Sequence, residues 1–218
     1  MPDAVMSSVS VPSRTEAVLD AVKHAILTGR LSPGQSLVET ELAAQLGVSK
    51  TPVREALKTL AGAGLVTMSP YKGASVRTVD DALAHSVYDI RILLEPEAVR
   101  RSAAHGEAAR ANWELAQAAL DAADRAIGRA DRQQANREFH RALYVGCGND
   151  LMVGFLDGLR DQTALVSTVV WTRNASWEQE AGEHLAILEA IKAGRADLAA
   201  SLLEEHIRAF VDRNFSAT

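Results

Sequence analysis

Three histidines in the second half of the chain have the pattern of a buried metal site. His140, His184 and His206 each fall in step with apolar residues of an expected helix, so the three imidazoles lie on inward-facing stripes of three different helices. Asn136 precedes His140 by four residues, which puts both side chains on one helical face. Buried imidazoles need a shared partner, and neutral imidazole binds divalent cations well. The pattern predicts a divalent metal ion, although one such histidine alone would more often be a core residue bonded to a backbone carbonyl.

The residues around these histidines do not form a hydrolytic site. The sequence has no H-E-x-x-H motif, no serine in a nucleophile elbow and no pair of carboxylates clearly tied to the cluster. We therefore expect a protein that is not an enzyme. Two alternatives stay open: a metal-dependent enzyme that uses the histidine cluster, and a purely structural metal ion with no small-molecule ligand.

A second functional pattern lies in the stretch LGVSKTPVREALKTL, residues 46–60. A short helix from about Glu39, a break at Gly47 and a second helix over about residues 49–61 have the spacing of a helix-turn-helix. In helix-turn-helix proteins that bind DNA, the N-terminal end of the second helix enters the major groove, and its backbone carries partial positive charge there. The pattern therefore predicts a contact with DNA at the start of the second helix.

The start of that helix carries capping residues and two cations. Ser49 or Thr51 can cap free backbone N–H groups, and Pro52 is tolerated in the first turn. Arg54 is the best candidate for a bidentate contact with guanine, whereas Lys50 is a more flexible point charge toward base or phosphate. We expect the residues closest to DNA to be Ser49, Lys50, Thr51 and Arg54. The opposite, core-facing side carries Val53, Leu57 and Leu60.

A β-hairpin is expected directly after the second helix. Two alternating runs, residues 65–68 and 74–79, flank the turn sequence SPYKG. Lys72 and Gly73 at the tip can reach the sugar-phosphate backbone, because lysine neutralises charge and glycine permits close approach. Each of these features also occurs in small helical domains that bind no DNA. In combination they favour a winged helix that binds DNA.

Charge and composition divide the chain into two parts. The 218 residues carry a net charge of −5, but residues 1–78 hold eight Lys and Arg against six acids, and the remainder holds 15 against 22. Because only the first part can tolerate a polyanion, we expect a domain boundary near Thr78–Asp80. The single Cys147 forms no internal disulfide, no apolar run approaches the roughly 20 residues of a membrane helix, and the first 14 residues lack a secretory signal pattern. We expect a cytoplasmic protein.

The second part shows only helical periodicity. Helices are expected over about residues 80–104, 107–127, 130–146, 150–171, 176–193 and 195–213. Short connections make neighbouring helices antiparallel, and bundles of this kind often hold ligand or metal sites between facing helices. The expected fold is mainly α: an N-terminal winged helix-turn-helix followed by an antiparallel six-helix bundle.

The N-terminal motifs resemble a known family. The segments G-R-L-x-P-G, L-V-E-x-x-L-A-x-x-L-G-V-S-x-T-P-V-R-E-A-L-x-x-L-x-x-x-G-L-V and G-A-x-V are similar to the winged helix of GntR-family transcription regulators, matched from about Arg14 to Val79. The resemblance implies that Thr40 also reaches the DNA backbone. In that family the position of Lys50 is usually Arg, and that of Thr40 is often Arg or another polar residue.

The bundle motifs extend the resemblance to the FCD effector domain of the FadR-like subgroup. They are D-I-R-x-x-L-E-P (89–96), N-R-E-F-H-R-A-L (136–143), G-N-D-L (148–151), E-H-L-A-I-L-E-A-I (183–191) and H-I (206–207). The resemblance implies a divalent metal ion, zinc or nickel, held by Asn136, His140, His184 and His206. The commoner residue at the first of these positions is Asp, which is a stronger ligand than a neutral amide oxygen.

The resemblance also implies an effector and an assembly. FCD domains bind small carboxylates, for which Arg91 and Arg160 are the candidate partners; an ion pair of Arg91 with Glu95, one helical turn on, is an equal alternative. Two winged helices of a homodimer would bind a roughly palindromic operator as a repressor. The expected organisation is a disordered tail over residues 1–13, a DNA-binding domain over 14–79 and an all-helical domain for effector binding and dimerisation over 80–218.

Overall fold

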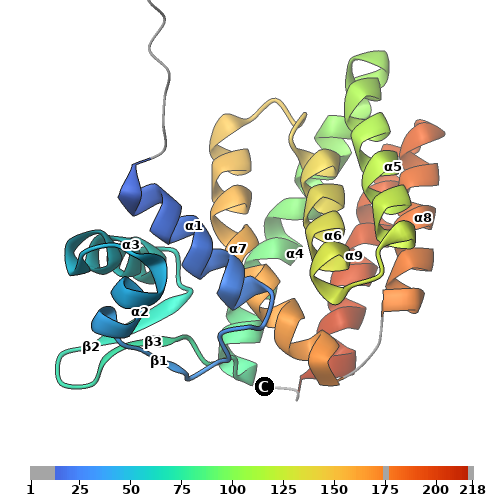
Figure 1. Ribbon diagram of the computed structural model, residues 1–218. Coiled ribbons are helices and arrows are strands. Elements are labelled where there is room, and N and C mark those ends of the chain that lie inside the picture. The colour runs from blue at the N-terminus through green and yellow to red at the C-terminus, as the bar shows by residue number, and fades with distance from the viewer. Residues whose placement is uncertain (1–12, 174–176, 216–218) are drawn as a thin grey trace, which may run out of the picture.

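The computed structural model describes residues 13–173 and 177–215 and is drawn in Figure 1. Its first part is a winged helix, as expected from the sequence. In chain order the elements are α1 (Arg14–Leu27), β1 (Ser36–Leu37), α2 (Glu39–Leu46), α3 (Lys50–Gly62), β2 (Val66–Ser69) and β3 (Gly73–Val76). Ser13 and Glu16 form a capping box that starts α1, so helix capping begins at the last residue of the expected tail. Residues 1–12, which make up the rest of that expected tail, lie outside the described residues.

The helix-turn-helix consists of α2 and α3. Gly47 ends α2 in the left-handed region (φ 65°), which glycine adopts without strain, and α3 begins three residues later. Ser49 occupies the N-cap position of α3, but its side chain makes no capping hydrogen bond. Of the two expected capping residues, Ser49 or Thr51, the prediction for the Ser49 side chain is therefore wrong. The predicted core face is confirmed, since Val53, Leu57 and Leu60 are all buried.

The wing is a three-stranded antiparallel sheet in the order β1-β3-β2. The hairpin pairs Val66 with Val76 and Ser69 with Gly73, which confirms the expected hairpin with slightly different strand bounds. Ser36 of β1 pairs with Ser75 on the other edge of β3. Sequence periodicity did not predict β1, because a two-residue strand has no measurable alternation.

Six long helices form the second part, close to the expected bounds. They are α4 (Asp81–Ala104), α5 (Arg110–Arg125), α6 (Arg129–Tyr144), α7 (Asp150–Arg173), α8 (Trp177–Lys192) and α9 (Ala196–Asn214), with a 3-10 turn, η1 (Gly106–Ala109), before α5. Asp80 caps α4 by accepting a hydrogen bond from the N–H of Leu83 (2.8 Å). Among the described helices, none is both long enough and apolar enough to cross a bilayer.

Helix α7 joins the two parts. Figure 1 shows α1 lying between α3 and α7. Ala164 and Leu165 of α7 are buried in the hydrophobic core of the winged helix, and Thr168 donates a hydrogen bond to the carbonyl oxygen of Leu27 at the end of α1 (3.0 Å). The winged helix and the bundle therefore share an interface through α7, and burial of apolar area stabilises this contact.

Candidate metal centre and nucleic-acid interface

The bundle brings the three histidines together. His140 lies on α6, His184 on α8 and His206 on α9, and one ring nitrogen from each lies within 4.8 Å of the others. All three side chains are buried, and the Nε2 atoms of His184 and His206 are 3.3 Å apart. Three imidazole nitrogens that converge in this way could hold one metal ion.

Carboxylates orient two of these rings. The Nδ1–H of His140 donates to Glu95 (2.7 Å), and the Nδ1–H of His206 donates to Glu183 (2.6 Å). Each hydrogen bond places the proton on Nδ1 and leaves the Nε2 lone pair for a metal, as in carboxylate–histidine–metal arrangements.

Each carboxylate is held in turn by an arginine. Arg91 binds Glu95 (2.7 Å), and Arg213 binds Glu183 (2.9 Å). Burial raises the pKa of Glu183, but the hydrogen bonds from His206 and Arg213 outweigh it and lower that pKa to about 2. The carboxylate is therefore ionised and can orient His206 at neutral pH.

Burial keeps the histidines neutral. Desolvation lowers the pKa of His140, His184 and His206 below the ordinary value. The effect is strongest for His184, which faces the other two rings and bonds no carboxylate of the described residues. A neutral imidazole has the free lone pair that a metal ion requires. The protonation state of the cluster therefore suits a metal site.

Asn136 supplies the observation that tests whether an ion fits. Its side-chain oxygen is buried and accepts no hydrogen bond from any described residue. Leaving such an oxygen unsatisfied costs free energy, and α6 places it one turn before His140. An amide oxygen one turn from a metal-binding histidine is a suitable fourth ligand for a divalent cation, although it contributes no negative charge.

Two cavities adjoin the cluster. Asn136 and His184 line a cavity of about 410 Å³ between α5, α6 and α8, which also contains Trp171 and Trp177. Asn136 and His140 line a small recess of about 30 Å³ on the side of α7. The first volume can take a small organic molecule, whereas the second has room only for a water-sized group.

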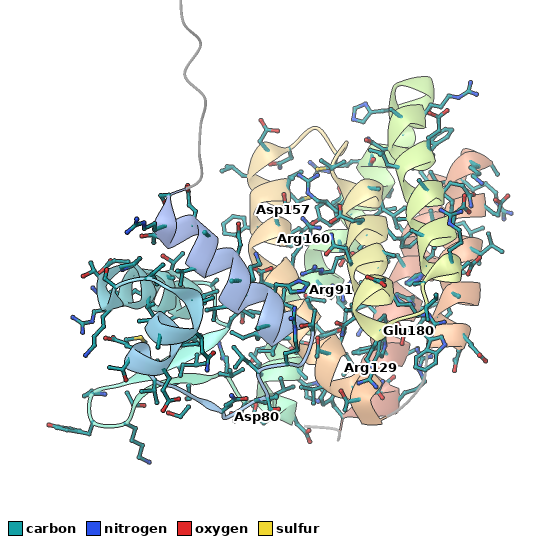
Figure 2. The ribbon with its side chains drawn as sticks, viewed as in Figure 1. Asp80, Arg91, Arg129, Asp157, Arg160 and Glu180 are labelled. Atoms are coloured by element: carbon teal, nitrogen blue, oxygen red, sulfur yellow. The ribbon has the colours of Figure 1, made fainter. Side chains whose placement is uncertain are left out.

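The two predicted effector arginines both line the small recess. Figure 2 shows Arg91 and Arg160 between the ribbons of α7 and α6 in that view. Arg91 makes the ion pair with Glu95 that was the alternative interpretation, and Arg160 binds Glu138 (2.9 Å). From the sequence, Glu95 was recognised only as a partner of Arg91, and Glu183 was not recognised at all. The position of Glu183 directly before His184 could have indicated a carboxylate near the histidine cluster.

The DNA-facing residues expected from the sequence lie on the exposed side of the winged helix. Exposed positions are Thr40 on α2, Ser49, Lys50, Thr51 and Arg54 at the start of α3, and Lys72 and Gly73 at the wing tip. Arg54 is held by Glu39 through its Nε (2.9 Å) and Nη2 (2.7 Å) atoms. Tyr71, which the sequence reasoning did not single out, is fully exposed beside Lys72.

The Glu183→Gln substitution tests whether the carboxylate of Glu183 orients the ring of His206 for metal binding. An amide neither carries the charge of the carboxylate nor fixes the ring tautomer as well, so the zinc affinity is expected to fall by about 10–100-fold. Competition with a chromogenic chelator measures it. Glu189→Gln is the matched control, since Glu189 lies on the same helix and pairs only with Lys192 (3.0 Å) in the described structure. Equal zinc affinity of the two variants would contradict the orienting role of Glu183.

Comparisons with known proteins match both parts of the chain. The family model described as bacterial regulatory proteins, gntR family, matches residues 14–76, and the model of the FCD domain matches residues 86–209. The chain is 29% identical over 213 residues to a probable D-xylose utilization operon transcriptional repressor of Paenarthrobacter nicotinovorans, covering 96% of this chain and 92% of the relative.

Two further proteins agree with these matches. The transcriptional repressor GlaR of Escherichia coli is 27% identical over 202 residues, covering 85% of this chain and 89% of GlaR. The solved structure of Escherichia coli McbR/YncC superposes with a TM-score of 0.75 at 24% identity, covering 93% of this chain and 99% of that chain. At this identity the structural likeness shows the fold alone.

Proposed function

Because the chain belongs to the GntR family of bacterial regulatory proteins and carries an FCD domain, we propose that it is a homodimeric repressor that responds to a metal-bound carboxylate effector. Transcription regulation is the activity named for its relatives, and none of those compared is named as an enzyme. We infer that the chain works without catalysis, in the cytoplasm, where its DNA lies.

The observation that carries the sensor part of the proposal is the orphaned oxygen of Asn136, one helical turn from His140, together with the three convergent imidazoles. The residues that would hold the ion are Asn136, His140, His184 and His206. All four are neutral, so a bound divalent ion, zinc or nickel, would keep its full charge and attract an anionic effector. A bound ion would supply Lewis acidity toward an effector oxygen; the chain's own residues supply the orientation of the rings and the exclusion of water.

The DNA-binding part of the proposal rests on α3 and the wing. Lys50, Thr51 and Arg54 form the N-terminal end of α3 that would enter the major groove, and Thr40, Lys72 and Gly73 would contact the backbone. A single winged helix reads only a half-site, so two copies related by a two-fold axis would bind a palindromic operator.

The effector changes DNA binding only if its affinity differs between two arrangements of the dimer. The shared α1–α7 interface is where such a difference would act, because α7 contributes Ala164 and Leu165 to the core of the winged helix and also carries Arg160 of the recess.

Selection of bound duplexes from a random pool, followed by fluorescence anisotropy with the full chain, tests the proposed DNA binding. We expect a two-fold symmetric site, with half-sites about one helical turn apart, and an affinity that falls linearly with log salt concentration. Binding that is equally tight to every duplex would contradict the proposal.

A structural metal ion without an effector is the remaining alternative from the sequence. It predicts that a chelator lowers the melting temperature while no small acid changes either melting or operator affinity. The cavity of about 410 Å³ that reaches Asn136 and His184 favours a site with a small-molecule ligand over this alternative.

A further inference from the structure

The C-terminal end of α1 is capped by side chains of the bundle. The last carbonyl groups of a helix have no partner within the helix, and Leu27 is the last residue of α1. The N–H of Leu31, in the turn that follows, donates to Ala25. The carbonyl oxygen of Leu27 instead accepts a hydrogen bond from the hydroxyl of Thr168 on α7 (3.0 Å). The cap on this carbonyl group therefore comes from the bundle.

Gln133 of α6 bonds the same carbonyl group. Both groups of its side-chain amide find partners when the amide nitrogen donates to the carbonyl oxygen of Leu27 (2.8 Å) and to the hydroxyl oxygen of Thr168 (3.2 Å). Each of the three residues is at most 6% exposed. Leu27, Gln133 and Thr168 form the Leu27 cluster, which joins α1 of the winged helix to α6 and α7 of the bundle through buried hydrogen bonds.

The hydrogen bonds of the Leu27 cluster fix an orientation as well as holding the two parts together. The contact of Ala164 and Leu165 with the core of the winged helix is apolar and therefore non-directional, so it tolerates a small rotation of one part against the other. A hydrogen bond weakens steeply when its angle changes, and breaking a buried one leaves a polar group unsatisfied, which costs free energy. The cluster is therefore fully bonded only when α1 lies at one angle across α6 and α7.

Two further contacts between the winged helix and α7 lie outside the Leu27 cluster. Lys23, one turn before Leu27 on α1, pairs with Asp161 (2.5 Å). Gly64, in the turn after α3, lies so close to α7 that a Cβ atom at this position would be 2.6 Å from the side chain of Gln162. Contacts at separate points restrict rotation about any one of them. The winged helix is therefore held on α7 both at α1 and after α3.

We propose that Gln133 and Thr168 are positioning residues that hold the winged helix at one orientation on the bundle and thereby set the spacing of the two DNA half-sites. The inference rests on the proposed DNA binding by a dimer. Helices α1 and α3 share one hydrophobic core, so an orientation imposed at Leu27 is passed to α3. Each base pair added between the half-sites moves them about 3.4 Å apart and rotates them by about 34° around the DNA axis. In a dimer held together by its bundles, winged helices that are fixed cannot follow this change, whereas released ones can.

The test measures how strongly the full chain prefers one half-site spacing. Fluorescence anisotropy compares the selected operator with the same duplex carrying one or two extra base pairs between the half-sites. The unaltered chain is expected to bind the lengthened duplexes about 10–100-fold less tightly, because the DNA must be deformed to restore both contacts. Thr168→Val and Gln133→Met should each reduce this ratio to less than about 3-fold, since a tethered domain without a fixed orientation can reach either spacing.

Matched variants separate the positioning role from a merely structural one. Thr172→Val is the control on the same helix, since the Thr172 hydroxyl donates to the carbonyl oxygen of Thr168 within α7 (2.6 Å) and bonds no described residue of α1. This variant should keep the full ratio. Thr168→Ser retains the hydroxyl and should keep the ratio too. Binding to a duplex with a single half-site should be equal in all variants, because the winged helix itself is unaltered.

The outcomes distinguish this inference from the proposed function. An unaltered chain that selects no DNA sequence contradicts the proposed function itself. An unaltered chain that selects an operator but binds every spacing equally overturns the positioning role, and so do Thr168→Val and Gln133→Met variants that keep the preference. Weaker binding by the same factor at every spacing also overturns it, because that result shows a structural role alone. Thermal melting is measured first for every variant, so that a folding defect is not mistaken for a released domain.

Discussion

Replacing His184 with alanine is expected to weaken zinc binding by more than about 100-fold, because altering even an outer-shell partner of a metal ligand costs about 10–100-fold. His184 is the buried imidazole nearest to His206, and it is the one residue of α8 in the three-histidine cluster of the described structure. Zinc affinity is measured by competition with a chelating dye. A variant that binds zinc as tightly as the unaltered chain would show that the ion lies elsewhere.

The same substitution should also remove the stabilisation by metal. Free zinc at 100 times its Kd contributes about 2.7 kcal/mol, which raises the Tm of a domain of this size by about 5–10 °C. The matched control is His105→Ala, which removes an exposed imidazole at the end of α4 outside the cluster. The control should keep the full rise in Tm, whereas His184→Ala should show none.

Replacing Arg54 with alanine is expected to weaken operator binding by about 1–3 kcal/mol, or roughly 5–150-fold, and to reduce discrimination between base pairs at one position of each half-site. Glu39 holds the Nε and Nη2 atoms of Arg54, whereas no described residue bonds its Nη1 atom, and the side chain is 55% exposed. A guanidinium fixed along one edge loses less conformational entropy when its free edge meets a guanine.

Lys58→Ala is the matched control for Arg54→Ala. Lys58 lies on the same helix, one turn further from its N-terminus, and pairs with Glu55 (3.0 Å). Both variants lose one positive charge, so both should bind all duplexes slightly less well. Only Arg54→Ala should lose sequence discrimination. A uniform loss in both variants would mean that Arg54 contacts phosphate instead of a base.

The helices could be predicted from the sequence because their apolar periodicity is strong. The six bundle helices lie within a few residues of their expected bounds. The two-residue strand β1 could not be predicted, since it exists only through pairing with β3. The side-chain cap by Ser49 was a sound local expectation that the structure does not contain.

The candidate site could be predicted only as far as local patterns reach. Apolar stripes placed the three histidines inward, and the structure brings them to one point. The carboxylate partners depend on how helices pack. Glu183 neighbours His184 in sequence but bonds His206 of α9, and Glu39 reaches Arg54 across fifteen positions. For Arg91 the two interpretations were equal from the sequence, and the packing of Glu95 between Arg91 and His140 favours the ion pair.

The most direct test of the metal-dependent sensor is the metal content of the full chain purified without chelators. Inductively coupled plasma mass spectrometry gives the ions per chain, with His184→Ala measured beside it. Three convergent imidazoles, with Asn136 as the proposed fourth ligand, predict about one divalent ion per chain in the unaltered protein and none above background in the variant. An unaltered chain that holds no zinc or nickel, even after incubation with either ion and desalting, would contradict the account.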